Sequence, residues 1–396
     1  MKIADRMEDL GTETAFEVLA EVKQLEAQGR DIISFAIGEP DFATPDNIKE
    51  AGITAIAHDE THYSPSAGRM ELREAVAEYI THTRHIQVTP QQVVITAGAK
   101  PIIFFTIMAT LNPGDEAIYP TPGFPIYESV IRFMGAKPVP LPLLEERNFE
   151  FDVDYLRSLI TPRTRLIILN SPHNPTGGVL STAALEAVAE MALEHDLWVL
   201  SDEVYSRIVF DGEFFSIAAI PGMQERTILL DGFSKTYAMT GWRLGYGVMN
   251  EKMAVHMARL VTNSESCTAT FTQLAGVEAL RGPQDATRAM VEQFKRRRDL
   301  IVNGLNSIKG VSCFFPRGAF YVYPNVTEAC RNLGLADSKA LQHKLLHEVG
   351  VAVLPRTSFG LRQPGEIEEY IRLSYATSEQ AIAEGLDRVA SLLGRS

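Results

Sequence analysis

Three polar runs of the sequence carry residues that could share one chemical task. They are Asn170-Ser-Pro-His-Asn174-Pro-Thr-Gly177, Ser201-Asp202-Glu-Val-Tyr205 and Asp231-Gly-Phe-Ser-Lys235-Thr-Tyr-Ala-Met-Thr-Gly-Trp-Arg243, and each follows an apolar, strand-like segment. A structural turn or a solvated surface loop could explain any one of them. Because the carboxyl ends of parallel strands meet at one crevice of an α/β sheet, the three runs together predict a ligand-binding site.

The residue types in these runs are those that a carbonyl cofactor held as a Schiff base requires. Lys235 supplies the amine for the covalent bond. Asp202 suits the carboxylate that keeps a pyridine nitrogen protonated, so that the ring withdraws electrons. Asn174 and Tyr205 suit the hydrogen-bonding groups that a phenolic oxygen needs. This combination of needs predicts pyridoxal 5'-phosphate as the cofactor.

The phosphate of such a cofactor needs cations and open backbone N–H groups. The turn Gly98-Ala99-Lys100 starts a predicted helix, and a helix N-terminus binds anions through its unpaired amides and its dipole. Arg243 adds a fixed cation that can form two parallel hydrogen bonds. These residues are therefore the candidate phosphate ligands.

Alternating strand-like and helical segments must position these groups. The apolar runs that predict strands lie at 93–96, 116–119, 166–170, 197–201, 227–231 and 244–249. Helical patterns lie between several of them, notably at 183–195. This order predicts an α/β fold with a mostly parallel sheet, buried on both faces. From about residue 283 the pattern changes to a long charged helix and hairpin-like strands.

Composition bounds the class of protein. The 396 residues include 37 Lys and Arg against 50 Asp and Glu, a net charge of −13, and 45% are hydrophobic. These values exclude a collagen, a disordered acidic tail and a small disulfide scaffold. The acidic balance argues against nucleic acid or an anionic membrane as the main partner. Three widely spaced cysteines predict unbridged thiols, and with no apolar span we expect a cytoplasmic enzyme.

Motifs of other ligand classes are missing or weak. The sequence has no GxxxxGK[ST] run and no HExxH run, and Gly241-x3-Gly245-x-Gly247 lacks the order of a dinucleotide fingerprint. We predict no metal site. The basic cluster Lys295-Arg-Arg-Arg298 could indicate nucleic-acid binding, but on a helix we expect it to form a solvated face.

Six runs resemble the aspartate aminotransferase family of fold-type I pyridoxal-phosphate enzymes, in its bacterial branch. They are Gly38-Glu-Pro-Asp-Phe, Tyr63-Ser-Pro-Ser-Ala-Gly68, Asn170–Gly177, Ser201–Tyr205, Ser234–Gly245 and Arg372-Leu-Ser-Tyr-Ala-Thr. The resemblance covers nearly the whole chain. It implies a large domain, residues 45–289, with a mostly parallel seven-stranded sheet flanked by helices. It also implies a smaller α+β domain built from both chain ends, residues 1–44 and 290–396.

The resemblance also assigns roles to single residues. The implied catalytic residues are Lys235, as the Schiff-base lysine, Asp202 and Tyr205. The implied cofactor-binding residues are Tyr63, Gly98, Ala99, Lys100, Phe124, Asn174, Asp202, Tyr205, Ser234, Lys235 and Arg243. The implied substrate-binding residues are Gly38, Lys100, Asn174 and Arg372, with Arg372 on the α-carboxylate.

Two of these assignments have a plainer alternative. Phe124 matches a ring that stacks on the cofactor, but it could be a packing residue of the core. Tyr63 matches the tyrosine that reaches the phosphate of the neighbouring subunit, but it could be an ordinary turn residue. The match at Tyr63 implies a homodimer with shared active sites.

The implied activity is amino transfer from an L-amino acid to a 2-oxo acid such as 2-oxoglutarate, by a ping-pong mechanism with Lys235 as general base. Lys100 stands where some bacterial relatives bind the distal carboxylate, which favours aspartate or glutamate. Glu13 and Ala15 stand where those relatives have small hydroxyl residues. A Glu13 that faced the pocket would favour a cationic substrate, whereas a surface-facing Glu13 would not. Aromatic, neutral or basic donors therefore stay open, as does a lyase or oxidase reaction on this fold.

Overall fold

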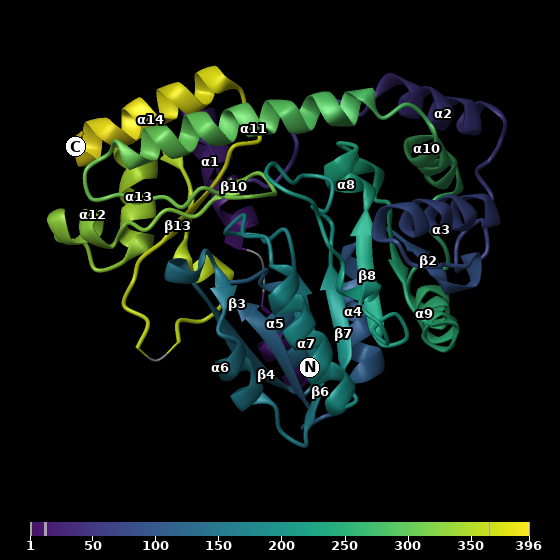
Figure 1. Cartoon of the computed structure of the whole chain (residues 1–396). Coiled ribbons are helices and arrows are strands. Elements are labelled where there is room, and N and C mark those ends of the chain that lie inside the picture. Colours follow the sequence, from purple (N-terminus) through teal and green to yellow (C-terminus); the bar gives the residue numbers. More distant parts are fainter. Residues whose placement is uncertain (1, 12–13, 364, 396) are drawn as a thin grey trace.

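The computed structural model describes residues 2–11, 14–363 and 365–395. Within these residues an eight-stranded sheet forms the centre of the molecule (Figure 1). Its strands, in spatial order, are β2 (Val93–Thr96), β9 (Gly245–Val248), β8 (Thr227–Gly232), β7 (Trp198–Asp202), β6 (Thr164–Asn170), β3 (Glu116–Thr121), β4 (Lys137–Leu144) and β5 (Glu150–Phe151).

Most of these strands are parallel. Strands β8, β7, β6, β3 and β4 run in one direction, β9 is antiparallel to both β2 and β8, and β5 is antiparallel to β4. The predicted α/β class and mostly parallel sheet are confirmed. Over the described residues the sheet has one strand more than the seven expected, because the two-residue β5 adds a short hairpin at the edge.

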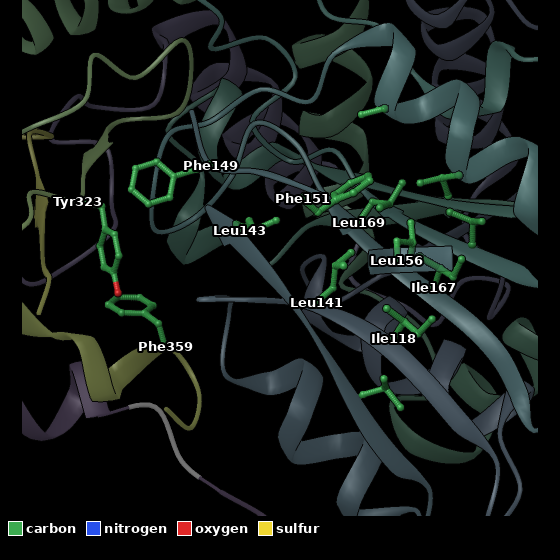
Figure 2. Packing of buried hydrophobic residues seen from close by; sticks show 14 of the residues in the cluster. Ile118, Leu141, Leu143, Phe149, Phe151, Leu156, Ile167, Leu169, Tyr323 and Phe359 are labelled. Carbon is green, nitrogen blue, oxygen red and sulfur yellow. The ribbon is translucent and has the colours of Figure 1, made fainter. Parts of the chain in front are cut away.

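Helices connect the strands and cover both faces of the sheet. They include α4 (Lys100–Thr110), α5 (Ile126–Phe133), α6 (Val153–Leu159), α7 (Thr182–Glu194) and α9 (Glu251–Ser264). Because successive strand residues point to opposite faces, Ile167 packs in a cluster with α6 and α7, whereas Ile168 packs with α4, α5 and α9. Figure 2 shows the first cluster, with Ile118, Ile167 and Leu169 near one another. Packing on both faces holds the strand ends in place.

A third group of helices covers the β2 side of the sheet. It comprises α2 (Asp46–Ala57), α3 (Met70–Arg84) and α10 (Thr270–Arg281). Buried side chains of all three share a cluster with residues of β2, β9 and β8, among them Ile48, Leu72 and Ala275. These three helices therefore belong to the core.

Both chain ends meet in smaller sheets. Strand β1 (Ile33–Ser34) pairs in parallel with β11 (Val351–Ala352), and β13 (Ile371–Ser374) pairs antiparallel with β10 (Tyr321–Val322) and β12 (Leu354–Pro355). The helices of these segments are α1 (Thr14–Ala27), α11 (Asp285–Asn306), α12 (Thr327–Asn332), α13 (Ser338–Val349) and α14 (Glu379–Leu393). The two-domain division stays a prediction. Helix α11 lies along α14 in Figure 1 and runs unbroken through residues 289 and 290, where the predicted domain boundary falls.

The prediction of a solvated face at Lys295–Arg298 is wrong for two of its residues. Arg297 is 6% exposed and Arg298 is 5% exposed. Arg297 pairs with Asp41 at 2.7 Å, and Arg298 pairs with Asp211 and Asp299. A guanidinium group can be buried when carboxylates satisfy its charge and its donors. These arginines therefore join α11 to its neighbours.

Other sequence-based expectations concern thiols, metals and membranes. Cys267, Cys313 and Cys330 are free, as predicted, and burial raises the pKa of Cys313 and Cys330. The described residues contain no group of His, Cys, Asp and Glu side chains arranged to hold a metal ion. They also form no helix with the length and apolar character that crossing a membrane requires.

Candidate active site

A cavity of about 620 Å³ lies at the carboxyl ends of the central strands. The polar runs after β6, β7 and β8 contribute Asn170, Asn174, Asp202, Tyr205, Ser234 and Lys235 to its wall. The other predicted residues on the wall are Gly38, Ala99, Lys100, Phe124, Arg243 and Arg372. Strand register explains the convergence, since Asn170 lies opposite Asp202, and Asp202 lies opposite Leu230. The polar runs that follow these strands therefore line one cavity, at the sheet edge where the sequence predicted a ligand-binding site.

Asp202 ends β7 and faces the cavity as a buried carboxylate. Its Oδ2 accepts a 2.7 Å hydrogen bond from the Tyr127 hydroxyl, and its Oδ1 accepts one of 3.3 Å from the Val204 backbone N–H. Burial raises the pKa of Asp202 to about 7, and the nearby carboxylates of Asp231 and Glu203 add to the increase. A positive ligand group beside Asp202 would relieve this electrostatic cost.

Lys235 lies in the one-turn helix α8 (Phe233–Thr236), directly after β8. Its Nζ donates a hydrogen bond of 2.5 Å to the carbonyl oxygen of Gly38. The same nitrogen lies 5.8 Å from the ring centre of Phe320. The amine therefore lies on the cavity wall beside Gly38, where a carbonyl ligand could meet it.

Arg243 and the start of α4 line another part of the cavity wall. The Arg243 backbone is left-handed, with φ of 53°, and its guanidinium donates to the carbonyl oxygens of Thr240 and Ala97 at 2.9 and 3.3 Å. Gly98 does not line the cavity, but a Cβ there would lie 2.2 Å from Arg243 Nη2. Gly98 therefore leaves room for the arginine. Ala99 precedes α4, whose N-terminus receives no side-chain cap from the described residues.

Arg372 and its neighbours form a further part of the cavity wall. Its Nη1 donates to Asn174 Oδ1 at 3.3 Å, and its Nη2 donates to the Ala36 carbonyl oxygen. The Tyr205 hydroxyl hydrogen-bonds to the Tyr321 hydroxyl at 2.7 Å. Arg372 is only 4% exposed. A fixed, buried guanidinium of this kind suits a carboxylate ligand.

Phe124 and Lys100 share the side wall of the cavity. The Phe124 ring packs edge-on against Tyr127, with ring centres 5.9 Å apart. Lys100 Nζ lies 5.3 Å from the centre of the Phe124 ring. Phe124 lines the cavity and also packs against the core, so its stacking role stays a prediction beside its packing role.

The structure also leaves Tyr63 off the cavity wall and does not describe Glu13. Tyr63 is outside the cavity and 90% exposed, in the connection between α2 and α3. Glu13 lies outside the described residues, although Ala15 and Phe16 of the adjoining α1 line the cavity. The structure therefore leaves the substrate-facing role of Glu13 untested and puts Tyr63 on the surface.

Sequence reasoning missed several wall residues. Tyr127, Tyr321, Glu39 and Thr240 contribute polar groups to the cavity. Glu39 and Thr240 lie within motifs that were recognised, although no role was given to them, and the Thr240 hydroxyl donates to Glu39. Tyr127 and Tyr321 lie within apolar segments that read as core, and no local signal separates them from packing residues.

Comparison with known proteins identifies relatives over nearly the whole chain. The family described as aminotransferase class I and II matches residues 30–389. A probable aspartate/prephenate aminotransferase of Aquifex aeolicus is 40% identical over 99% of this chain and 98% of its own length. Aromatic-amino-acid aminotransferase 2 of Thermococcus litoralis is 41% identical, again over 99% of this chain and 98% of its own.

A solved structure has the same fold. The aspartate aminotransferase of Thermus thermophilus with maleate matches with a TM-score of 0.92 at 38% identity, covering 99% of this chain and 100% of that one. The similarity thus extends over the cavity and both chain ends. The chain belongs to the aminotransferase class I and II family.

Proposed function

We propose that this aminotransferase holds pyridoxal 5'-phosphate on Lys235 and moves an amino group from an L-amino acid to a 2-oxo acid such as 2-oxoglutarate. One observation carries the proposal. An amine, a buried carboxylate and two fixed guanidinium groups, those of Lys235, Asp202, Arg243 and Arg372, line a single cavity of about 620 Å³. That volume lies in the range of cofactor and substrate sites.

The donor set fits this cofactor. Among the described residues Asp202 accepts hydrogen bonds from Tyr127 and Val204, and burial raises its pKa to about 7, so a cation beside it would be favourable. A protonated pyridine nitrogen would supply that cation. Elsewhere on the wall, Arg243, Ser234 and the N-terminus of α4 would hold the phosphate. Asn174 and Tyr205 would hydrogen-bond the phenolic oxygen.

Bound pyridoxal phosphate supplies an aldehyde that condenses with amines and a ring that withdraws electrons from the substrate α-carbon. Lys235 would hold the cofactor covalently until the substrate amine replaces it. The Lys235 amine would then take the substrate α-proton as a general base. Asp202 would keep the proton on the pyridine nitrogen, and Arg372 would orient the substrate by its α-carboxylate.

The preferred donor is aspartate or glutamate. Lys100 lines the cavity and could receive the distal carboxylate of such a substrate. An aromatic donor is the second candidate, because Lys100 lies beside the Phe124 ring and the same wall contains the apolar Ile37 and Ile103. The names of the relatives include both substrate classes.

A panel of amino donors with 2-oxoglutarate tests the function. We expect glutamate formation with aspartate, and a Lys100→Met variant should lose more activity with aspartate than with phenylalanine. Cofactor absorbance in each half-reaction then ranks the donors. Oxo acid released without any 2-oxo acid acceptor would instead indicate a lyase or oxidase.

We also propose a homodimer in which Tyr63 reaches the neighbouring site. Tyr63 is 90% exposed, and Ile53, Ile56 and Met70 nearby in sequence are 66%, 51% and 45% exposed. Apolar groups of this kind favour a subunit interface. Mixing Lys235→Ala with Tyr63→Ala chains tests it, since a shared site regains activity in the mixed dimer and a site within one chain does not. The expected cytoplasmic location stays a prediction.

A further inference from the structure

Tyr321 contacts more of the proposed site than any local signal indicated. It lies in β10, is 1% exposed, and pairs with Ser374 of the antiparallel strand β13. Arg372 precedes Ser374 by two residues, so both point to the same face of β13. The guanidinium carbon of Arg372 accordingly lies 4.6 Å from the centre of the Tyr321 ring. The ring is a flat support for the arginine that would bind the substrate carboxylate.

The Tyr321 hydroxyl contacts two further residues of the proposed site, Tyr205 and Gly38. It forms the 2.7 Å hydrogen bond with the Tyr205 hydroxyl. A Cβ at Gly38 would lie 2.1 Å from the Tyr321 oxygen, so only glycine fits beside it. Gly38 also accepts the hydrogen bond from Lys235. The hydroxyl is therefore fixed between the backbone that Lys235 contacts and the phenol that would face the cofactor.

A bound cofactor would fix the direction of the hydrogen bond between the Tyr205 and Tyr321 hydroxyls. Burial raises the pKa of Tyr205, so this phenol keeps its single proton. If Tyr205 donates that proton to the phenolic oxygen of the cofactor, it must accept a hydrogen bond from Tyr321. Donors in series polarise one another, and the positive charge over the Tyr321 ring strengthens its hydroxyl as a donor.

From these contacts, and resting on the proposed function, we infer that Tyr321 is a positioning residue for the amino-transfer site. Its hydroxyl holds Tyr205 as a donor to the cofactor, and its ring holds Arg372 for the substrate α-carboxylate. The two roles depend on different parts of one side chain. A Tyr321→Phe variant removes the hydroxyl alone, and a Tyr321→Leu variant removes the aromatic support as well.

The test uses the holoenzyme and two measurements. The first is the pH at which the absorbance of the Lys235-linked cofactor titrates, and the second is the KM for 2-oxoglutarate. A weaker donor leaves more negative charge on the phenolic oxygen, which favours the protonated linkage. Tyr321→Phe should therefore raise the titration midpoint by about 0.5–1 pH unit and change KM little. Tyr321→Leu should also raise KM about tenfold, with a smaller effect on kcat.

Tyr323→Phe is the matched control, because it makes the same change two residues along the same segment. Among the described residues the Tyr323 hydroxyl is buried with no hydrogen-bond partner, and Figure 2 shows it beside the Phe359 ring. Tyr323→Phe should titrate as the wild type does. A Tyr321→Phe midpoint equal to that of the control would overturn the inference, even where Tyr321→Leu fails to fold. A wild type that forms no absorbing linkage through Lys235 would overturn the proposed function, and the inference with it.

Discussion

The Tyr127 hydroxyl donates a 2.7 Å hydrogen bond to Oδ2 of Asp202, although the two residues are 75 positions apart in the sequence. Tyr127 comes from α5 and Asp202 from the end of β7. The bond fixes the carboxylate plane and favours its ionised form, because a carboxylate accepts such a bond more strongly than a carboxylic acid does. Tyr127 therefore prepares Asp202 for a cationic ligand.

We expect Tyr127→Phe to weaken cofactor binding about tenfold, the effect of one lost hydrogen bond to a charged group of about 1.4 kcal/mol. The change removes a donor from a buried carboxylate and leaves the ring packing in place. Titration of the cofactor-free protein with pyridoxal phosphate measures the dissociation constant. Tyr155→Phe, at a half-exposed position remote from the cavity wall, is the control. Equal affinities for the two variants would contradict the role given to Tyr127.

Replacement of Lys235 by alanine should abolish the covalent attachment while the cofactor still binds. We expect turnover to fall by about 10⁴-fold or more, because the nucleophile and the general base are lost together. Borohydride reduction should attach the cofactor irreversibly to the wild type but not to Lys235→Ala. Lys295→Ala is the control and should still be labelled, because the Lys295 side chain donates to the Phe210 carbonyl oxygen outside the cavity. Normal turnover of Lys235→Ala would refute the assignment.

The sequence identified residues whose position follows from strand order. Asn174, Asp202 and Lys235 follow successive parallel strands, and the ends of such strands coincide whatever their side chains. Short polar motifs with a Gly or Pro turn are also local, so their recognition needs no knowledge of distant contacts. This is why the α/β class, the cavity and most of the polar residues on its wall could be predicted.

Contacts between distant segments could not be predicted in this way. Tyr321 and Tyr205 are 116 residues apart, and an aromatic residue in an apolar run reads as core whether or not its hydroxyl has a function. The burial of Arg297 and Arg298 depends on Asp41 and Asp211, which helical periodicity does not reveal. Contacts between distant segments decide whether these side chains are buried and which partners they have, and no local sequence pattern indicates such contacts.

Arg84 should be essential for stability, because it neutralises two buried carboxylates beside the site. It pairs with Glu203 at 2.7 Å and with Asp231 at 2.9 Å, and all three side chains are at most 3% exposed. Arg84→Met would leave both charges unpaired and should lower the free energy of unfolding by roughly 3–5 kcal/mol. Urea denaturation measures the loss.

The charge explanation for Arg84 has its own control. Adding Glu203→Gln and Asp231→Asn to Arg84→Met removes the unpaired charges with little change in volume, so stability should largely return. If the triple variant is as unstable as Arg84→Met, packing of the arginine side chain rather than its charge explains the loss.

Asp202→Asn should stabilise the cofactor-free protein at alkaline pH. Burial raises the pKa of Asp202 from 3.8 to about 7, so the folded state binds a proton that the unfolded state has released between these values. The wild type therefore loses stability as pH rises from about 4 to 7, whereas the Asp202→Asn variant does not, because an amide does not titrate. At pH 8 the variant should be more stable by roughly 4 kcal/mol, and the difference should vanish near pH 4.

Urea denaturation of both cofactor-free proteins from pH 4 to 8 measures this difference. With cofactor bound, the Asp202→Asn variant should be less active than the wild type, because Asn cannot hold a proton on the pyridine nitrogen. Its turnover should fall far more than its substrate affinity. A stability difference that stays constant with pH would show that Asp202 does not titrate in this range. The carboxylate would then be ionised without the cofactor, and the need for a cationic ligand beside it would no longer support the proposed site.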